Sequence, residues 1–120
     1  MSRGLIHVEI KGKKYIVPFS MGTLEHLEQI TGEDPYKFTI PLDSVKGFLD
    51  GVSTVVYAAL LSNSAVKEEQ PEYTREDVAR YIKSLTYAEV SELLKVYQSA
   101  YGTASQEGSG DTQGAASNVE

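Results

Sequence analysis

The feature that most constrains the fold is an apolar pattern of helical period between residues 42 and 62. Its apolar side chains recur at alternating spacings of three and four, which places them on one face of an α-helix. They are Leu42, Val45, Leu49, Val52, Val56 and Ala59, and the same face is widened by Phe48, Val55 and Leu60. The pattern predicts a long helix from about Leu42 to Ser62 at the centre of the core.

Residues 5–19 predict a β-hairpin. Two strands, Leu5–Ile10 and Lys14–Phe19, would be joined by a two-residue turn at Lys11-Gly12. In that register Glu9 lies opposite Lys14 on the outer face, a favourable cross-strand pair. The face that should meet the helices carries Ile6, Val8, Tyr15, Val17 and Phe19.

Three shorter helices complete the predicted fold. The first lies between residues 22 and 31, and Gly32 follows it as a left-handed cap. After a polar connection over residues 63–73, Thr74 starts the next helix, and a capping box of Thr86 and Glu89 starts the last one. Their apolar positions are Leu24, Leu27 and Ile30; Val78, Ile82 and Leu85; and Val90, Leu94, Tyr97 and Tyr101. A hairpin followed by four helices is an α+β fold.

The composition of the chain changes sharply after Gly102. Residues 103–120 contain no aromatic residue, no lysine or arginine, and one branched aliphatic residue. Such a segment cannot bury enough apolar area to offset the entropy of ordering it. We therefore expect a single, mostly helical α+β domain over residues 1–102 and a disordered, acidic tail rich in Gly, Ser and Ala over residues 103–120.

Composition also limits the classes of function. The chain has 17 acidic and 11 basic side chains, a formal net charge of −6, and no cysteine, which excludes disulfides and thiolate zinc sites. Its longest apolar run, Val55–Leu61, has seven residues, far fewer than the ~20 that cross a bilayer. The first 19 residues contain no signal-peptide core, and an acidic surface repels phosphates. We expect a soluble cytoplasmic protein that binds neither membranes nor nucleic acids.

Residues 1–19 differ from the rest because they carry four basic side chains and one acidic one. Three of the basic residues, Lys11, Lys13 and Lys14, surround the predicted hairpin turn. Two interpretations remain open. The lysines either decorate a solvated turn or form a basic tip that docks on an acidic partner.

The sequence offers little catalytic chemistry. His7 and His26 are the only histidines, they belong to different predicted elements, and each fits a structural position near the surface. The carboxylates of Glu25, Glu28, Glu89 and Glu92 fall on predicted solvated helix faces, so no acid–base pair stands out. We expect no catalytic residue, no metal site and no cofactor, and therefore a protein that is not an enzyme.

Two features suggest binding instead. In the central helix a stripe of small residues contains two glycines, each costing about 1 kcal/mol relative to alanine, so another helix should approach closely there. That helix belongs either to the same chain or to a second subunit of a homo-oligomer. The stripe consists of Gly47, Gly51, Thr54 and Ala58.

The second feature is the tyrosine content, eight residues against no tryptophan. Tyrosine is favoured in protein interfaces, but it also serves as half-buried core. The three tyrosines of the last predicted helix are therefore either partner contacts or packing residues. They are Tyr87, Tyr97 and Tyr101.

Four stretches of the sequence, in their order and spacing, resemble the tail assembly chaperones of long-tailed (siphovirus-like) phages and prophages. The resemblance covers about residues 5–101 and rests on Val8-Glu-Ile-Lys-Gly-Lys-Lys-Tyr15, Leu27-Glu-Gln-Ile-Thr-Gly-Glu-Asp-Pro35, Val55-Val-Tyr-Ala-Ala-Leu60 and Thr74-Arg-Glu-Asp-Val78. The family has no catalytic residues, so the resemblance agrees with the absence of a recognisable active site.

The resemblance implies a protein that works in the host cytoplasm and is absent from the mature virion. Members of the family hold the tape measure protein until the tail tube polymerises around it, and many also occur in a longer, frameshifted form. The tape measure protein is thus the expected partner, and the major tail tube protein is a further one. Two alternatives stay open: a structural minor tail or head–tail joining protein of the virion, and a small cytoplasmic adaptor or regulator.

Overall fold

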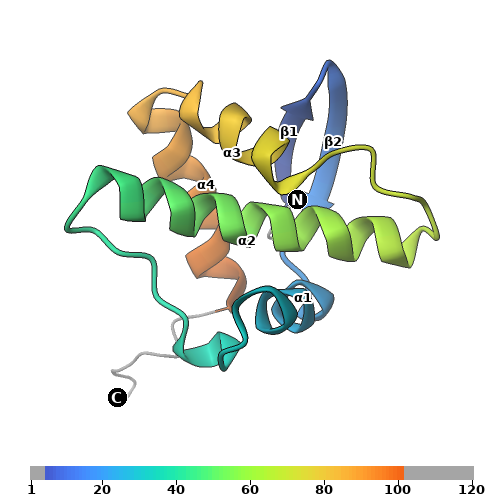
Figure 1. Cartoon of the computed structure of the whole chain (residues 1–120), viewed down its shortest axis with the longest axis horizontal. Helices are drawn as coiled ribbons and strands as arrows, with labels where there is room; N and C mark the ends of the chain where they lie inside the picture. Colours follow the sequence, from blue (N-terminus) through green and yellow to red (C-terminus); the bar gives the residue numbers. More distant parts are fainter. Residues whose placement is uncertain (1–4, 102–120) are drawn as a thin grey trace.

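The computed structural model of the chain describes residues 5–101, which form a two-stranded hairpin followed by helices (Figure 1). This arrangement confirms the predicted α+β class. Figure 1 shows α2 crossing the molecule, with α1 on one side of it and α3 and the hairpin on the other. The elements are β1 (Leu5–Ile10), β2 (Lys13–Pro18), α1 (Met21–Thr31), the 3₁₀ helix η1 (Pro35–Lys37), α2 (Val45–Val66), α3 (Arg75–Lys83) and α4 (Tyr87–Tyr101).

The hairpin forms in the predicted register. Lys11 and Gly12 both have positive φ, 54° and 81°, as a two-residue hairpin turn requires. Glu9 lies opposite Lys14, as predicted. The second strand runs from Lys13 to Pro18 rather than from Lys14 to Phe19, because it pairs up to the turn and ends at a proline, which has no N–H to donate. The side chains buried beneath the hairpin are Ile6, Val8, Ile10, Val17 and Phe19.

The long helix α2 forms the centre of the core, as predicted, but its predicted ends were wrong. It starts at Val45 because the side chain of Ser44 caps it, accepting a hydrogen bond from the N–H of Gly47 at 3.0 Å. Leu42 therefore lies outside the helix. At the other end the helix continues to Val66, past the predicted stop at Ser62. By length and composition α2 could span a bilayer, yet 56% of its most apolar 18-residue window is buried inside the fold.

The predicted helix starts and stops are confirmed at three places. Gly32 ends α1 with a φ of 72°, in the left-handed conformation. Thr74 caps α3, and its own backbone N–H donates to Asp77 at 2.9 Å. That hydrogen bond is the main reason why the pKa of Asp77 lies below its ordinary value. The N–H of Thr86 donates to Glu89 at 2.9 Å, which completes the predicted capping box of α4.

Aromatic side chains join the end of α4 to the β2–α1 junction. The ring of Phe19 lies 5.4 Å from that of Tyr97, which in turn lies 5.4 Å from that of Tyr101. The hydroxyl of Tyr101 donates to the carbonyl oxygen of Ser20 at 2.7 Å. On the face of α4 that packs on the core, Val90 and Leu93 are buried. Leu94, the position predicted from the sequence, is half-buried. The predicted tail at residues 103–120 lies outside the described residues.

Candidate binding grooves

A wide hollow lies where the start of α2 meets the connection between α3 and α4, and we call it the corner groove. Its volume is about 540 Å³. Three of its rim residues have large, solvent-exposed apolar side chains, with exposed fractions of 78% for Leu42, 76% for Val45 and 81% for Tyr87. The groove is lined by Leu42, Asp43, Ser44, Val45, Phe48, Leu49, Ile82, Lys83, Leu85, Tyr87 and Val90.

The corner groove is apolar at its base and nearly neutral at its rim. Ile82 and Val90 are buried beneath it, and Phe48 and Leu49 are half-buried along one wall. Its lining contains one acidic residue, Asp43, and one basic residue. The groove therefore suits an apolar ligand surface and offers few charged side chains for a ligand to pair with.

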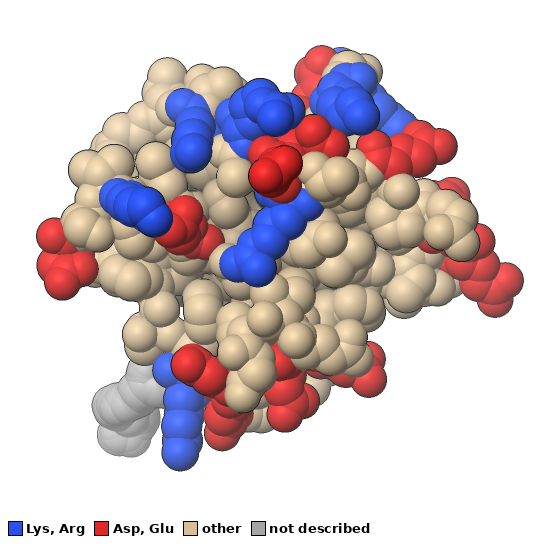
Figure 2. All heavy atoms as spheres, viewed as in Figure 1, with Lys and Arg blue, Asp and Glu red and all other residues tan. Residues whose placement is uncertain are grey.

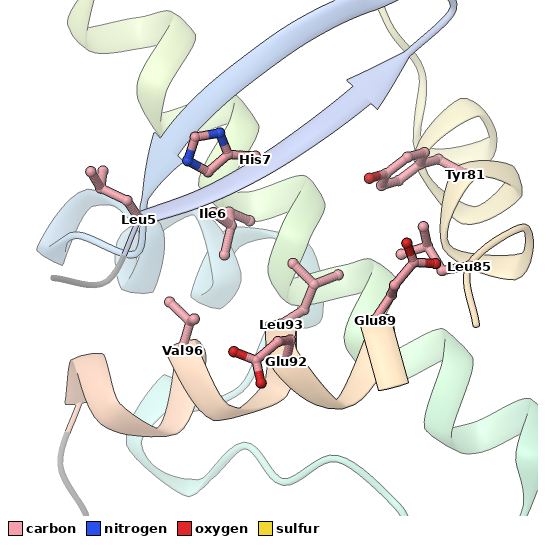
Figure 3. A pocket seen from close by; sticks show the side chains of 9 residues that line it. All are labelled: Leu5, Ile6, His7, Tyr81, Leu85, Glu89, Glu92, Leu93 and Val96. Atoms are coloured by element: carbon pink, nitrogen blue, oxygen red, sulfur yellow. The ribbon is translucent and has the colours of Figure 1, made fainter. Parts of the chain in front are cut away.

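A second, smaller groove lies between β1 and α4, with α3 at one end, and we call it the edge groove (Figure 3). Its volume is about 290 Å³. Burial raises the pKa of Tyr81, which stands at its end, and a hydrogen bond from the backbone of Glu9 opposes that rise. The groove is lined by Leu5, Ile6, His7, Tyr81, Leu85, Glu89, Glu92, Leu93 and Val96.

The edge groove brings together three polar residues that no sequence motif connects, namely His7, Glu89 and Glu92. Both carboxylates have neighbours on their own helix or its cap. Glu89 accepts from Thr86 in the capping box, and Glu92 lies 3.6 Å from the amine of Lys95. Within residues 5–101 no group of three or more His, Cys, Asp or Glu side chains is placed to hold a metal ion. The groove thus combines an apolar base with an acidic rim.

The small-residue stripe of α2 is covered by its own chain. A Cβ at Gly51 would lie 2.9 Å from Cγ2 and 3.3 Å from Cα of Ile40, and one at Gly47 would lie 3.2 Å from Cβ of Pro41. The two glycines therefore admit the loop before α2, not a helix as expected. This contact supplies the close approach that the glycines require within a single chain.

The remaining two members of the stripe also have partners in the same chain. The hydroxyl of Thr54 accepts a hydrogen bond from Nη2 of Arg75 at 2.9 Å and donates to the carbonyl oxygen of Asp50 at 2.7 Å. Ala58 is fully buried. Of the two interpretations of the stripe, the structure supports packing within one chain.

The lysines of the hairpin turn lie beside acidic side chains of the same chain. The amine of Lys13 lies 3.3 Å from Glu72, whose hydrogen bond is the main cause that raises the pKa of Lys13. The amine of Lys11 lies 3.9 Å from Asp77, and Lys14 lies opposite Glu9 in the hairpin. Figure 2 shows basic and acidic side chains next to one another at this end of the molecule. This mixture favours the solvated turn over a basic docking tip.

The three candidate tyrosines of α4 divide between the surface and the core. Tyr87 is exposed on the rim of the corner groove. Tyr97 and Tyr101 are half-buried in the aromatic cluster with Phe19, and burial raises the pKa of Tyr101 to about 12. Of the histidines, His26 has its Nδ1 at 3.0 Å from the carbonyl oxygen of Gly22, a local structural contact.

The sequence pattern did not reveal either groove. The helical period predicts that Leu42 and Val45 lie on the buried face of the central helix, but the structure leaves both exposed. The helical period identified them as apolar, but it carries no information about which part of the chain would cover them. Comparisons with protein-family models, with curated proteins and with solved structures find no match to this chain.

Proposed function

We propose that the chain is a tail assembly chaperone, and that its corner groove binds an apolar helical segment of the tape measure protein. The observation that carries the proposal is the open groove with three exposed large apolar side chains, Leu42, Val45 and Tyr87, on its rim. Contiguous exposed apolar surface of this kind marks interaction sites. The resemblance of residues 5–101 to this family supports the choice of client.

The geometry of the groove favours a helix as its occupant. An amphipathic helix presents its anchor residues at spacings of three and four, and these insert into grooves between other helices. Each large apolar side chain that becomes fully buried contributes roughly 1.5–3 kcal/mol. A groove of this size accepts only a few, so the affinity of one copy is modest, and several copies along one long client supply the strength of the complex.

The charge of the chain fits the same role. A tape measure protein exposes apolar surface before assembly, and such surface drives aggregation. A formal net charge of −6 on each bound copy keeps the complex in solution. The proposal places the protein in the host cytoplasm, with no part in the mature virion.

The test is co-expression of the chain with its cognate tape measure protein. We expect the tape measure protein to stay soluble and to co-purify with several copies of the chain. Because the groove is apolar and nearly neutral, the complex should survive about 0.5 M salt, where the Debye length is only a few ångströms.

A matched pair of double variants tests whether the tape measure protein binds at the corner groove. Val45→Ser with Tyr87→Ser removes two rim residues of the groove, and Val66→Ser with Tyr36→Ser makes the same substitutions at residues that are 78% and 75% exposed outside it. The first variant should lose the client and the second should keep it. Equal solubility of the tape measure protein with and without this chain would contradict the proposal, and a structural tail protein or an unrelated adaptor would then account better for the fold.

A further inference from the structure

The edge of β1 carries backbone groups that the sheet does not use. The sheet has two strands, so each strand has one open edge. Ile10 and Lys13 flank the two-residue turn and form a hydrogen-bonded pair, and such pairs alternate along an antiparallel ladder. The pair of His7 with Ile16 is therefore a non-hydrogen-bonded one. The N–H and C=O of His7, and likewise those of Leu5, point away from β2.

An independent contact agrees with this assignment. Glu9 occupies the same kind of position as His7, two residues further along β1. Tyr81, on α3, lines a hollow together with His7, Val8 and Glu9. The open edge of β1 thus faces α3, and Tyr81 lies beside it near Glu9. Between Leu5 and His7 the edge continues into the edge groove.

The edge groove runs along this strand. β1 packs toward α3 and α4, whereas β2 packs toward α2, so the groove lies on the side of β1 away from its partner strand. Figure 3 shows β1 on one side of the groove and α4 on the other. The base is apolar, with Ile6 and Leu93 buried and Val96 half-buried. A strand edge beside a helix, with an apolar base between them, is the arrangement in which an extended peptide adds to a sheet.

The rim of the groove indicates the charge of such a peptide. Glu89 and Glu92 reach the groove from α4, and His7 borders it from β1. No lysine or arginine is among the described residues that line it. A carboxylate rim favours basic side chains, which form charge-assisted hydrogen bonds with it.

We propose that the edge groove binds a short extended segment of another protein, which pairs with β1 as a third strand and carries lysine or arginine between apolar residues. Side chains alternate along a strand, so one set points toward α4. A lysine or arginine of that set lays its aliphatic stem over Leu93 and Val96 and meets Glu89 and Glu92 with its charge, while the other set points to the face that carries His7. Leu5 and His7 span about 7 Å of strand, which about three residues of the peptide cover. A helix is excluded, because its backbone groups are already paired and cannot bond to the edge.

The proposal is independent of the chaperone function, since the two grooves share Leu85 alone among their lining residues. Its test uses synthetic peptides and the full chain. Acetyl-Val-Lys-Val-Lys-Val-Lys-amide should bind at least roughly tenfold more tightly than the version with glutamate in place of lysine, measured by isothermal titration calorimetry. The backbone amides of Leu5 and His7 should shift in NMR spectra on binding.

The role of the peptide backbone is tested by methylating its amide nitrogens. One peptide is methylated at the valine amides and the other at the lysine amides. In an extended strand only one of these two sets faces β1, so one methylated peptide should lose binding and the other should keep it. Equal affinity of the two would overturn pairing with the strand edge.

Two proline variants test the strand. His7→Pro removes the N–H that faces the groove, and Ile16→Pro removes the one directly opposite, which faces the other edge. Neither N–H belongs to the ladder, so both variants should fold. His7→Pro should abolish binding of the lysine peptide and Ile16→Pro should leave it unchanged. Equal effects of the two would overturn the proposal.

A second pair of variants decides the question if a proline variant fails to fold. Glu92→Lys reverses a charge on the rim, and Glu25→Lys makes the same change on the exposed face of α1. Affinity for the lysine peptide should fall at least roughly tenfold in the first variant only. An equal loss of affinity in both variants would mean that the peptide responds only to the net charge of the chain, and it would overturn the proposal. Self-association of the free chain through its β1 amides would instead identify a second copy as the occupant and overturn the proposal.

Discussion

Two consecutive stretches of α2 both contain large apolar side chains but have opposite surroundings: Val45–Asp50, here called the open end, and Gly51–Leu60, here called the buried end. Between Gly51 and Leu60 every residue except Tyr57 is buried, under the hairpin, α1 and α3. Between Val45 and Asp50 none is fully buried, although Phe48 and Leu49 are as apolar as the residues that follow them. Apolar content alone therefore does not determine burial in this helix. One end provides the stability of the fold, and the other keeps an apolar surface available.

The largest expected effect is on the free energy of unfolding at the buried end. Leu60→Ala removes a side chain that is 1% exposed, so it should cost about 2–5 kcal/mol through lost burial and a cavity. The same substitution at Leu42, beside the open end, should stay within about 0.5 kcal/mol. Urea denaturation of both variants measures the contrast. Equal losses would mean that the open end also holds the fold together.

The next effect is expected at the boundary between the two ends. Gly51→Leu would push into Ile40, where even a Cβ lies 3.3 Å from the backbone Cα, so overpacking should cost about 1–3 kcal/mol. Because the contact lies within one chain, the variant should lose stability without a change in oligomeric state, as measured by sedimentation. A folded variant that loses self-association would reassign the small-residue stripe to a subunit interface.

Where the signals were local, the sequence was sufficient to predict the structure. The turn at Lys11-Gly12 and the alternation of the flanking residues determined the hairpin register. Thr74, with Asp77 three residues on, marked the start of α3, and Gly32 marked the end of α1. In each case the hydrogen bonds that decide the structure join residues within a few positions of one another.

Where the deciding partner is distant, the sequence prediction failed. Residues 63–66 are helical although they looked like a polar connection, because the hydroxyl of Ser64 is buried at 2.8 Å from that of Tyr73. That contact replaces the water a surface serine would have. The edge groove is a similar case, since His7 and Glu92 come from opposite ends of the chain. The spacing of neighbouring residues in the sequence predicts neither arrangement.

A smaller effect on the free energy of unfolding is expected from alkaline pH, because several tyrosine hydroxyls are partly buried in the fold. The pKa of Tyr101 is raised to about 12, mainly by burial, and the pKa of Tyr73 and of Tyr97 is also raised. The folded state therefore keeps protons that the unfolded state loses above pH 10. This contribution to stability is complete below about pH 10 and is lost as the pH rises toward 12.

Tyr101→Phe separates the two roles of that side chain. At pH 8 it should cost about 1 kcal/mol, because the hydrogen bond to Ser20 is lost. Between pH 10 and 12 its stability should fall less steeply than that of the unmodified chain, because one phenol no longer titrates. Denaturation curves at a series of pH values give both numbers. Parallel slopes would show that Tyr101 does not contribute to the alkaline loss.

The smallest effect on stability and on client binding is expected from deletion of residues 103–120. This deletion tests whether that segment covers the open end of α2. Val119 is its only branched aliphatic residue, and it contains no aromatic residue to place over Leu42, Val45 or Tyr87. The thermal midpoint should therefore stay within a few degrees, and binding of the tape measure protein should not change. A fall in stability of more than about 2 kcal/mol would mean that the segment docks on the domain. Tighter client binding after the deletion would mean that it docks on the corner groove itself, and the exposed rim would then be a covered one.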